Sequence, residues 1–114
     1  MSDTRKYLAF DFGADSGRAV LGTLQEGKIT LEEVHRFPTQ GLTLLGTRQW
    51  DLARFHEEQL RALKACADRF GPHLDGIACD TWGVDFALLA RDGTILANPV
   101  HYRDKRTEGM IEEA

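Results

Sequence analysis

The sequence predicts an α/β fold, a mixed β-sheet crossed by one long helix. Short apolar runs, bounded by glycine, proline and charged residues, recur along the chain as buried strands do. One stretch, residues 52–70, has its apolar residues at helical spacing instead. At 114 residues, with 42% hydrophobic and 28% charged residues, the chain has the composition of a globular domain.

The first three predicted strands follow one another through short connections. Residues 7–12 (YLAFDF) form a compact apolar run, residues 18–24 (RAVLGTL) a second strand and residues 28–37 (KITLEEVHRF) a third. The connections, GADSG and an EG turn, are too short for a crossover, so we expect antiparallel pairing. The third strand alternates in part, and its predicted inward residues are Ile29, Leu31, Val34 and Phe37.

The helix follows a predicted loop over residues 38–48. We expect it to begin after Asp51, a good N-cap, and to end at Gly71 and Pro72. Its apolar residues, at close to helical spacing, are Leu52, Phe55, Leu60, Leu63, Ala67 and Phe70.

Strand patterns return after the helix. Residues 75–81 (DGIACDT) are a fourth strand, and the strand–helix–strand connection favours a parallel position beside an earlier strand. Residues 84–90 and 94–100 are predicted to form a β-hairpin around an RDG turn, and the closing RTEGMIEEA looks like the opening of a helix. The β-β-β-α-β order with a hairpin matches the ribonuclease H-like core of actin-type and hexokinase-type ATPases, but fold does not fix function.

Charge and cysteine content narrow the classes of function. With 14 basic and 18 acidic residues the net charge is -4, which disfavours nucleic acid or an anionic membrane as the partner. No apolar run reaches the roughly 18–20 residues of a membrane-spanning helix, and the first residues do not resemble a secretory signal. Two cysteines make neither a disulfide framework nor a zinc site, so a reducing cytoplasm is the simplest location.

Several reactive residue types have structural interpretations. We expect Cys66 on a buried side of the helix and Cys79 in a strand, neither of them with a basic neighbour that would activate a thiolate. Glu57 and Glu58 are predicted to lie on the solvated helix surface. The 4 histidines lack the spacing of metal ligands.

The first candidate site is DFGADSGR, between the first two strands. Gly13 and Gly17 allow backbone conformations that let several N–H groups approach an anion. Ser16 adds a hydroxyl, Arg18 a positive charge, and Asp11 at the strand end a ligand for hydrated Mg²⁺. The alternative is an ordinary glycine-containing hairpin; the segment is not a Walker A loop, because it has no GK[ST].

The second candidate site is CDTWGVDF, at the end of the fourth strand. If that strand is parallel to the first, Asp11 and Asp80 end at the same edge of the sheet, where ligands usually bind. Trp82 beside Gly83 suits a sugar, whose C–H face packs on indole while its hydroxyl groups contact aspartates such as Asp85. The alternative is a core tryptophan beside a turn.

The third candidate segment is HYRDKRT. Arg103 or Asp104 can hydrogen-bond a polyol or hold a loop over it. The alternative is a solvated turn with a local ion pair.

Together, DFGADSGR, QWD, DTWGVDFALL and PVHYRDKRT resemble the FGGY carbohydrate kinase family from about residue 7 to the last residue. The first segment is shared in looser form across that family, whereas DTWGVDF with YRDxRT is more specific and points to its L-rhamnulose-phosphorylating members. The resemblance implies transfer of the γ-phosphoryl group of ATP, with Mg²⁺, to the 1-hydroxyl of L-rhamnulose. The product, L-rhamnulose 1-phosphate, belongs to L-rhamnose degradation.

The resemblance also implies roles for residues. Asp11 serves the metal, Gly83 contacts the sugar beside Trp82 and Asp85, and the ATP phosphates contact Ala14, Asp15, Ser16, Gly17 and Arg18. Asp15 departs from the pattern, since many relatives have serine or threonine there.

Kinases of this family are several times longer and close two ribonuclease H-like domains over the substrate. The resemblance places their catalytic base, an aspartate, and their adenine pocket downstream of Ala114, so no catalytic residue is expected within this chain. We therefore expect residues 1–114 to be the N-terminal part of the first kinase domain, inactive without the second lobe.

Two other classes of function remain open. Acids on the first and fourth strands also suit a two-metal nuclease, although the net charge and the missing basic groove disfavour it. A non-enzymatic module that senses a sugar or nucleotide is the third, but the sequence has no helix-turn-helix pattern to support it.

Overall fold

The structure, a computed structural model that describes residues 3–113, has a four-stranded mixed sheet with order β3-β2-β1-β6. Strands β1 and β2 pair antiparallel, as do β2 and β3, whereas β6 pairs parallel to β1. This confirms the predicted β-β-β-α-β order. The elements are β1 (Arg5–Phe12), β2 (Ser16–Gln25), β3 (Lys28–Pro38), β4 (Leu42–Leu44), β5 (Thr47–Gln49), α1 (Leu52–Phe70), β6 (Gly76–Asp80), a 3-10 turn (Lys105–Thr107) and α2 (Met110–Glu113).

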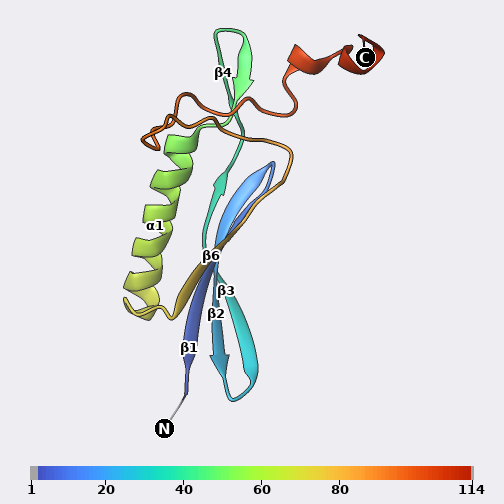
Figure 1. Cartoon of the computed structure of the whole chain (residues 1–114). Coiled ribbons are helices and arrows are strands. Elements are labelled where there is room, and N and C mark those ends of the chain that lie inside the picture. The colour runs from blue at the N-terminus through green and yellow to red at the C-terminus, as the bar shows by residue number, and fades with distance from the viewer. Residues whose placement is uncertain (1–2, 114) are drawn as a thin grey trace.

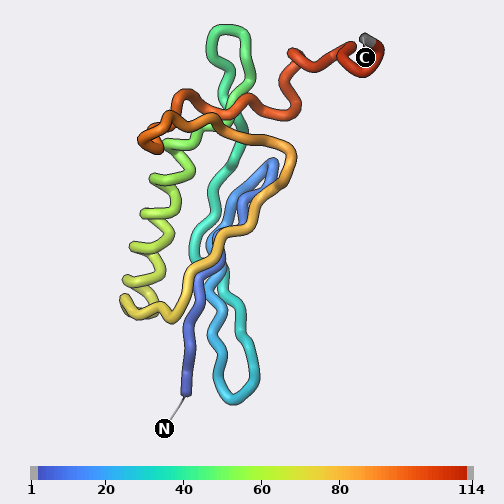
Figure 2. The backbone as a smooth tube through the Cα atoms, viewed as in Figure 1, coloured from blue at the N-terminus to red at the C-terminus, as the bar shows by residue number. Residues whose placement is uncertain are grey.

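The molecule is elongated, with α1 along one face of the sheet (Figure 1). The small β4–β5 hairpin projects beyond the end of the sheet, and the chain after β6 crosses back over that end before α2 extends away from the body (Figure 2). The short α2 agrees with the predicted opening of a helix. Ala114, downstream of which the catalytic base is expected, lies outside the described residues. None of the helices within residues 3–113 is long and apolar enough to cross a membrane.

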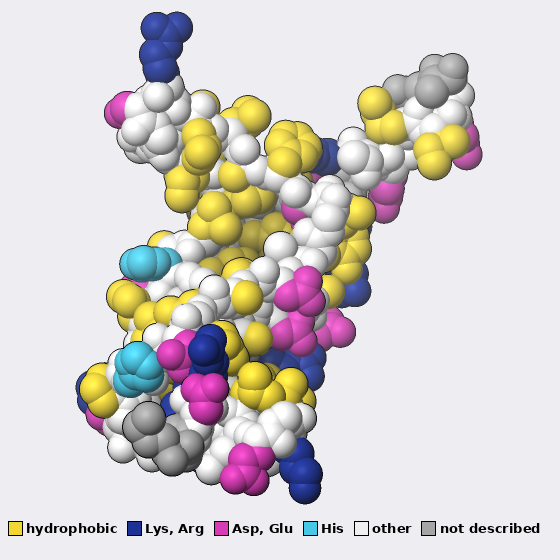
Figure 3. Space-filling model, turned by 60° about the horizontal axis from the view of Figure 1, so that its bottom comes forward, with side chains coloured by type: hydrophobic (Ala, Val, Ile, Leu, Met, Phe, Trp, Pro, Cys, Tyr) yellow, Lys and Arg dark blue, Asp and Glu magenta, His cyan; other side chains and the backbone are white. Residues whose placement is uncertain are grey.

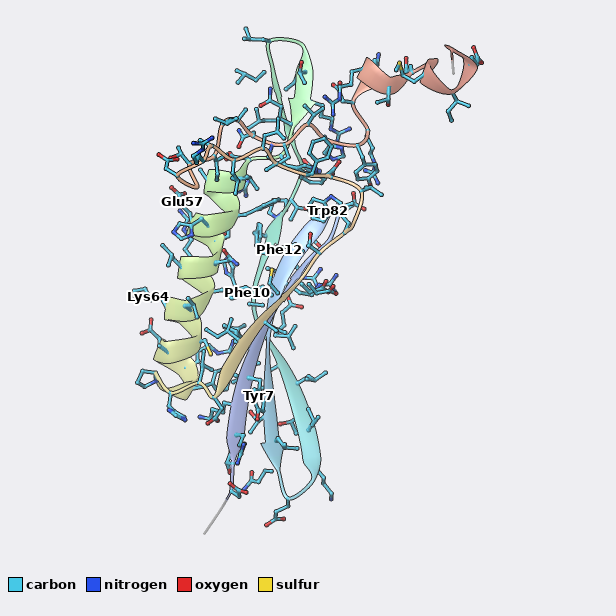
Figure 4. The ribbon with its side chains drawn as sticks, in the orientation of Figure 1. Tyr7, Phe10, Phe12, Glu57, Lys64 and Trp82 are labelled. Carbon is cyan, nitrogen blue, oxygen red and sulfur yellow. The ribbon has the colours of Figure 1, made fainter. Side chains whose placement is uncertain are left out.

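The core lies between the sheet and α1. Leu8, Phe10 and Phe12 alternate along β1 and are all buried, because every second side chain of a strand points to the same face. Figure 4 shows Phe10 and Phe12 between β1 and the helix. Full burial of such a side chain stabilises a fold by about 1.5–3 kcal/mol. The remaining buried members of this cluster are Ala19, Leu21, Phe37, Ala62 and Cys66.

The helix has the predicted ends, and most of its predicted apolar residues lie on the side that faces the core. The Asp51 carboxylate accepts the Arg54 N–H, and the Gly71 N–H donates to the Ala67 carbonyl. Of the apolar residues at helical spacing, Phe55, Leu63 and Phe70 pack against the core, whereas Leu60 is 53% exposed. The buried residues are Glu58, Ala62 and Cys66, whose four-residue spacing keeps them on one stripe and whose two small members let the helix lie close to the sheet.

The prediction of a solvated position is wrong for Glu58, which is buried, and correct for Glu57, which is exposed. The burial of Glu58 is compensated by two partners. His35 Nε2 on β3 lies 2.5 Å from its Oε2, and Arg61 donates to its Oε1 at 2.7 Å. A buried carboxylate needs such partners, and the spacing of residues in the sequence does not predict them.

The Glu58 contact predicts acid sensitivity. Burial raises the pKa of Glu58, but the hydrogen bond from His35 and the charge of Arg61 outweigh it, so the pKa lies below its ordinary value. Because the folded-state pKa is lowered, this stabilisation is present above the ordinary glutamate pKa and is lost as the pH falls below about 4. Urea denaturation between pH 7 and pH 3 should show this loss, and Glu58→Gln should flatten that part of the profile. An unchanged profile in the variant would contradict the assignment.

The third strand changes face at a β-bulge. Ala19 pairs with His35 but Val20 pairs with Glu33, so Val34 is an extra residue. The alternation therefore shifts by one, and Phe37 is buried while Ile29 and Leu31 are 66% and 69% exposed on the other face. The predicted inward set is correct for Phe37 and the half-buried Val34, and wrong for Ile29 and Leu31.

Two loop regions also differ from prediction. The predicted loop over residues 38–48 contains β4 and most of β5, joined through Leu45 and Gly46, which both have positive φ. The predicted strands over residues 84–90 and 94–100 do not form. One isolated bridge, Leu89 with Ile95, remains beside the expected turn at Gly93. Two backbone hydrogen bonds, from the Ala90 N–H to the Thr94 carbonyl and from the Leu96 N–H to the Leu88 carbonyl, still join the two runs, so the chain turns back as predicted without a regular ladder.

Candidate functional site

The first and second candidate sites, DFGADSGR and CDTWGVDF, lie at the same edge of the sheet. Asp11 and Asp80 are register partners at the ends of the parallel strands β1 and β6. The chain therefore leaves both strands on one side, into DFGADSGR after β1 and into the Trp82–Gly83 corner after β6 (Figure 4). The predicted meeting of the two segments is confirmed. Open α/β sheets bind ligands at this kind of edge.

The loop over residues 13–16, called the phosphate loop below for its predicted role, is closed by its own backbone. The Gly13 N–H donates to the Ser16 carbonyl at 2.9 Å, and a Cβ on Gly13 would lie 3.0 Å from that oxygen. At Gly17 a Cβ would lie 2.5 Å from the Phe37 ring. Glycine is therefore required at Gly17 by core packing beneath the loop, a reason that the sequence did not reveal.

The charges around this loop form two ion pairs. Arg18 Nε lies 3.4 Å from Asp11 Oδ2, with 37% and 46% of the two side chains exposed. Arg103 Nη1 lies 3.7 Å from Asp15 Oδ1, with the Asp15 side chain 88% exposed. The Asp15 carboxylate thus faces solvent and Arg103, rather than the interior of the loop.

The residues present suit a metal ion that is held mainly by phosphate oxygens. Within residues 3–113, no group of three or more His, Cys, Asp or Glu side chains could hold a metal ion. Asp11 and Asp80 supply adjacent carboxylates at the sheet edge. Mg²⁺ is commonly held by one or two carboxylates together with water and substrate phosphates, and this pair fits that pattern.

An aromatic cluster built around one carboxylate supports the sugar-side corner. Asp85 Oδ2 accepts the indole N–H of Trp50 at 2.5 Å and that of Trp82 at 2.6 Å. Trp50 is 1% exposed and stacks on His101 with ring centroids 3.9 Å apart. Trp82 is half-buried against the core, and its ring centroid lies 4.3 Å from that of Trp50. Two of the three predicted sugar residues, Trp82 and Asp85, are thus engaged with protein partners.

Gly83, the third, lies open. A Cβ added to Gly83 would meet no atom within 4 Å, and the residue is exposed. The next residue, Val84, lines a cavity of about 420 Å³, whose polar lining includes Asp85, His101, Tyr102 and Arg106. A second cavity, of about 440 Å³, lies between the start of α1 and Trp82. Figure 3 shows hydrophobic side chains gathered in a hollow of the surface.

The HYRDKRT segment is held largely by its own polar groups. The Asp104 carboxylate accepts the N–H groups of Arg48 and Arg106, which lower the pKa of Asp104. His101 is buried, its Nδ1 accepts the Arg103 N–H at 3.0 Å, and burial lowers its pKa, so the ring is neutral. The segment packs on Trp50 and reaches the phosphate loop through Arg103, which favours the loop-holding interpretation over a free solvated turn.

Thr39 is a residue of the site that sequence reasoning missed. It is 2% exposed, and it donates its hydroxyl to the Gly13 carbonyl and its N–H to the Asp15 carbonyl. It falls in the predicted loop over residues 38–48, and a single threonine after a proline carries no pattern. Only the path of β3 brings it beside the phosphate loop.

The chain is similar in sequence to proteins named rhamnulokinase. It is 45% identical over 106 residues to the protein of Oceanobacillus iheyensis and 42% identical over 108 residues to that of Bacteroides thetaiotaomicron. These matches cover 93% and 95% of this chain but 22% of each relative. The chain thus spans about a fifth of the length of these curated relatives. No protein-family model matches the chain.

Solved sugar-kinase structures share the fold. A gluconate kinase from Lactobacillus acidophilus superposes with a TM-score of 0.76 at 14% identity, over 98% of this chain and 22% of that one. A xylulose kinase from the same organism gives a TM-score of 0.75 at 14% identity, over 96% and 22% of the two chains. The ribonuclease H-like α/β fold class expected from the element order is confirmed.

Proposed function

We propose that this chain is the N-terminal part of the first domain of a rhamnulokinase, which transfers the γ-phosphoryl group of ATP to the 1-hydroxyl of L-rhamnulose. Identities of 42–45% to proteins of that name support the assignment. The observation that carries it is the pairing of Asp11 with Asp80, which joins the phosphate loop and the Gly83 corner at one edge. A phosphate donor and a sugar acceptor must meet in such a place.

In this proposal the chain binds and orients both substrates. Backbone N–H groups of residues 14–17 and the Arg18 guanidinium contact the phosphate oxygens and reduce their negative charge. The Gly83 backbone hydrogen-bonds the sugar, and the preceding residue, Trp82, is held in place by its hydrogen bond to Asp85. Asp11, with Asp80 beside it, would hold Mg²⁺, which neutralises charge on the transferring phosphoryl group. Asp11 would then share its carboxylate between the metal and Arg18.

The remaining chemistry lies outside this chain. The sugar hydroxyl oxygen forms the new bond to the γ-phosphorus as the bond to ADP breaks, and its proton goes to an aspartate base that the rest of the enzyme supplies. The second lobe also supplies the adenine pocket, so this chain alone is expected to be inactive. A cytoplasmic location, which suits two unpaired cysteines, stays a prediction.

The assay that tests this function uses the full-length enzyme and couples ADP release to NADH oxidation, with L-rhamnulose, xylulose, gluconate and glycerol compared as acceptors. We expect the highest kcat/KM with L-rhamnulose and a phosphorus NMR signal for its 1-phosphate. Preference for another acceptor would refute the substrate, and turnover by residues 1–114 alone would refute the division of roles.

Arg18 gives a sharper test of the phosphate side. We expect Arg18→Gln to raise the KM for ATP about tenfold, since it removes a charge beside the phosphates, with the KM for L-rhamnulose nearly unchanged. Lys64→Gln is the matched control, because it removes the same charge from a side chain that is 79% exposed on α1, away from the sheet (Figure 4). Equal effects of the two substitutions would contradict a phosphate-binding role for Arg18.

A two-metal nuclease is the weaker candidate. The Asp11–Asp80 pair would suit it, but no third acidic or histidine group joins the pair within residues 3–113. Mg²⁺-dependent cleavage of an RNA–DNA hybrid by the full-length protein would reverse this preference.

A further inference from the structure

Thr39 occupies a position that is set by the sheet rather than by the loop that it contacts. It directly follows β3, whose last residue, Pro38, is the register partner of Ser16 in β2. That pairing places Thr39 under the phosphate loop, although it is 26 residues from Gly13 along the chain. The loop is therefore supported by the end of a sheet strand, which is a rigid element.

The contacts of Thr39 reach two carbonyl groups of the loop. Its hydroxyl donates to the Gly13 carbonyl at 2.6 Å, and its backbone N–H donates to the Asp15 carbonyl at 3.1 Å. Both bonds are shielded from water, since Thr39 is 2% exposed. The Gly13 carbonyl shares its peptide unit with the Ala14 N–H, so the bond from Thr39 turns that N–H the opposite way, out of the core. The N–H groups of Ala14 and Asp15 donate to no backbone acceptor within residues 3–113.

We propose that Thr39 is a positioning residue for the phosphate loop, which fixes the loop backbone so that its free N–H groups point toward the phosphates of ATP. This inference rests on the proposed kinase function. An N–H group that is already aimed at an anion needs no reorganisation when the anion binds. The bond from Thr39 to the Gly13 carbonyl holds the Ala14 N–H in this way, because the two groups lie on opposite sides of one peptide unit. Without the Thr39 hydroxyl, the shielded Gly13 carbonyl would lose its partner, and the loop would be expected to rearrange toward solvent.

The proposal also accounts for the aspartate within the loop. Thr39 holds residue 15 by its backbone carbonyl, while the Asp15 side chain is 88% exposed and contacts Arg103 at 3.7 Å. An ion pair this exposed contributes little and cannot replace the two shielded hydrogen bonds. The conformation of the loop therefore depends on Thr39 and tolerates a charged side chain at Asp15.

The test compares Thr39→Val, which keeps the shape but removes the hydroxyl, with Thr39→Ser, which keeps the hydroxyl, in the full-length enzyme. We expect the valine variant to raise the KM for ATP about tenfold, the fold-change for a loss of about 1.4 kcal/mol, with the KM for L-rhamnulose within twofold. The serine variant should lie within about threefold of wild type. Thr43→Val, at an exposed threonine on β4, is the matched control and should behave as wild type.

Amide hydrogen exchange at residues 13 and 39, whose N–H groups donate to the Ser16 and Asp15 carbonyls, is the readout that does not depend on activity. It is measured by mass spectrometry without substrates. It should be faster in Thr39→Val and near wild type in Thr39→Ser. Unchanged exchange and an unchanged KM for ATP in the valine variant would overturn the proposal, as would equal increases in the KM for both substrates. If the valine variant does not fold, Thr39→Cys, with its weak S–H donor, takes its place with the same expectation.

Failure of the kinase assignment would look different. Wild-type enzyme that phosphorylates no sugar would refute the proposed function, whatever the exchange data show. Active wild-type enzyme whose Thr39→Val variant keeps the wild-type KM for ATP and the wild-type exchange rate would refute the role of Thr39 and leave the kinase function intact.

Discussion

Replacing Gly17 with alanine is expected to lower the free energy of unfolding by about 1–3 kcal/mol, the usual cost of overpacking a core. The new Cβ would lie 2.5 Å from Cζ of Phe37 and 3.0 Å from Cδ1 of Phe12. Neither ring has free space to enter, because both are buried and both also contact Phe55. The displaced strand end would carry the phosphate loop with it, so we also expect a raised KM for ATP in the full-length enzyme. Urea denaturation measures the first effect and steady-state kinetics the second.

Gly22→Ala is the matched control in the same strand. A Cβ on Gly22 would lie 3.5 Å from Cδ2 of Leu31, an ordinary contact on the face of the sheet away from α1. Its stability should stay within about 0.5 kcal/mol of wild type or rise slightly, because alanine is favoured over glycine in a strand. Equal stability of the Gly17 and Gly22 variants would show that Phe37 can move aside and that the close packing at Gly17 is not needed.

Asp85→Ala is expected to disrupt the sugar-side corner. The substitution removes the acceptor of two indole N–H groups, those of Trp50 and Trp82, and Trp50 is 1% exposed. Hydrogen bonds to a charged group are worth about 1.5–3 kcal/mol each, and an unsatisfied buried donor adds to the cost, so we expect a loss of at least about 2 kcal/mol. Trp82 would then no longer hold Gly83 in place, and the KM for the sugar should rise more than the KM for ATP.

Intrinsic fluorescence reports this cluster directly, because Trp50 and Trp82 are the 2 tryptophans of the chain and both contact Asp85. We expect a shifted emission maximum in Asp85→Ala and a smaller shift in Asp85→Asn, whose amide oxygen still accepts a hydrogen bond. Asp68→Ala, at a carboxylate that is 64% exposed on α1, should leave the spectrum unchanged. Wild-type emission and stability in Asp85→Ala would mean that the carboxylate is free for substrate, as the sequence interpretation had it.

Local signals were enough for the elements that carry their own pattern. The compact apolar run YLAFDF predicted β1, and the Asp51 cap and the Gly71 stop predicted the ends of α1; both elements are confirmed. The parallel position of β6 was predicted from the strand–helix–strand connection, and the shared edge of Asp11 and Asp80 follows from that position. These features depend on side-chain period and chain geometry, which a linear sequence displays.

Long-range contacts decided the rest. The bulge at Val34 places Ile29 and Phe37 on opposite faces of the sheet. Glu58 is buried where His35 and Arg61 both contact its carboxylate. In the same way, Asp85 faces two indoles and Thr39 lies under the phosphate loop because separate segments converge on them. Such roles depend on partners far away along the chain, and these long-range partners cannot be predicted from residue type and spacing. The sequence was thus enough to predict the strand order and the edge of the sheet where the site lies. Which side chains support that site was decided by the contacts that form in the tertiary structure.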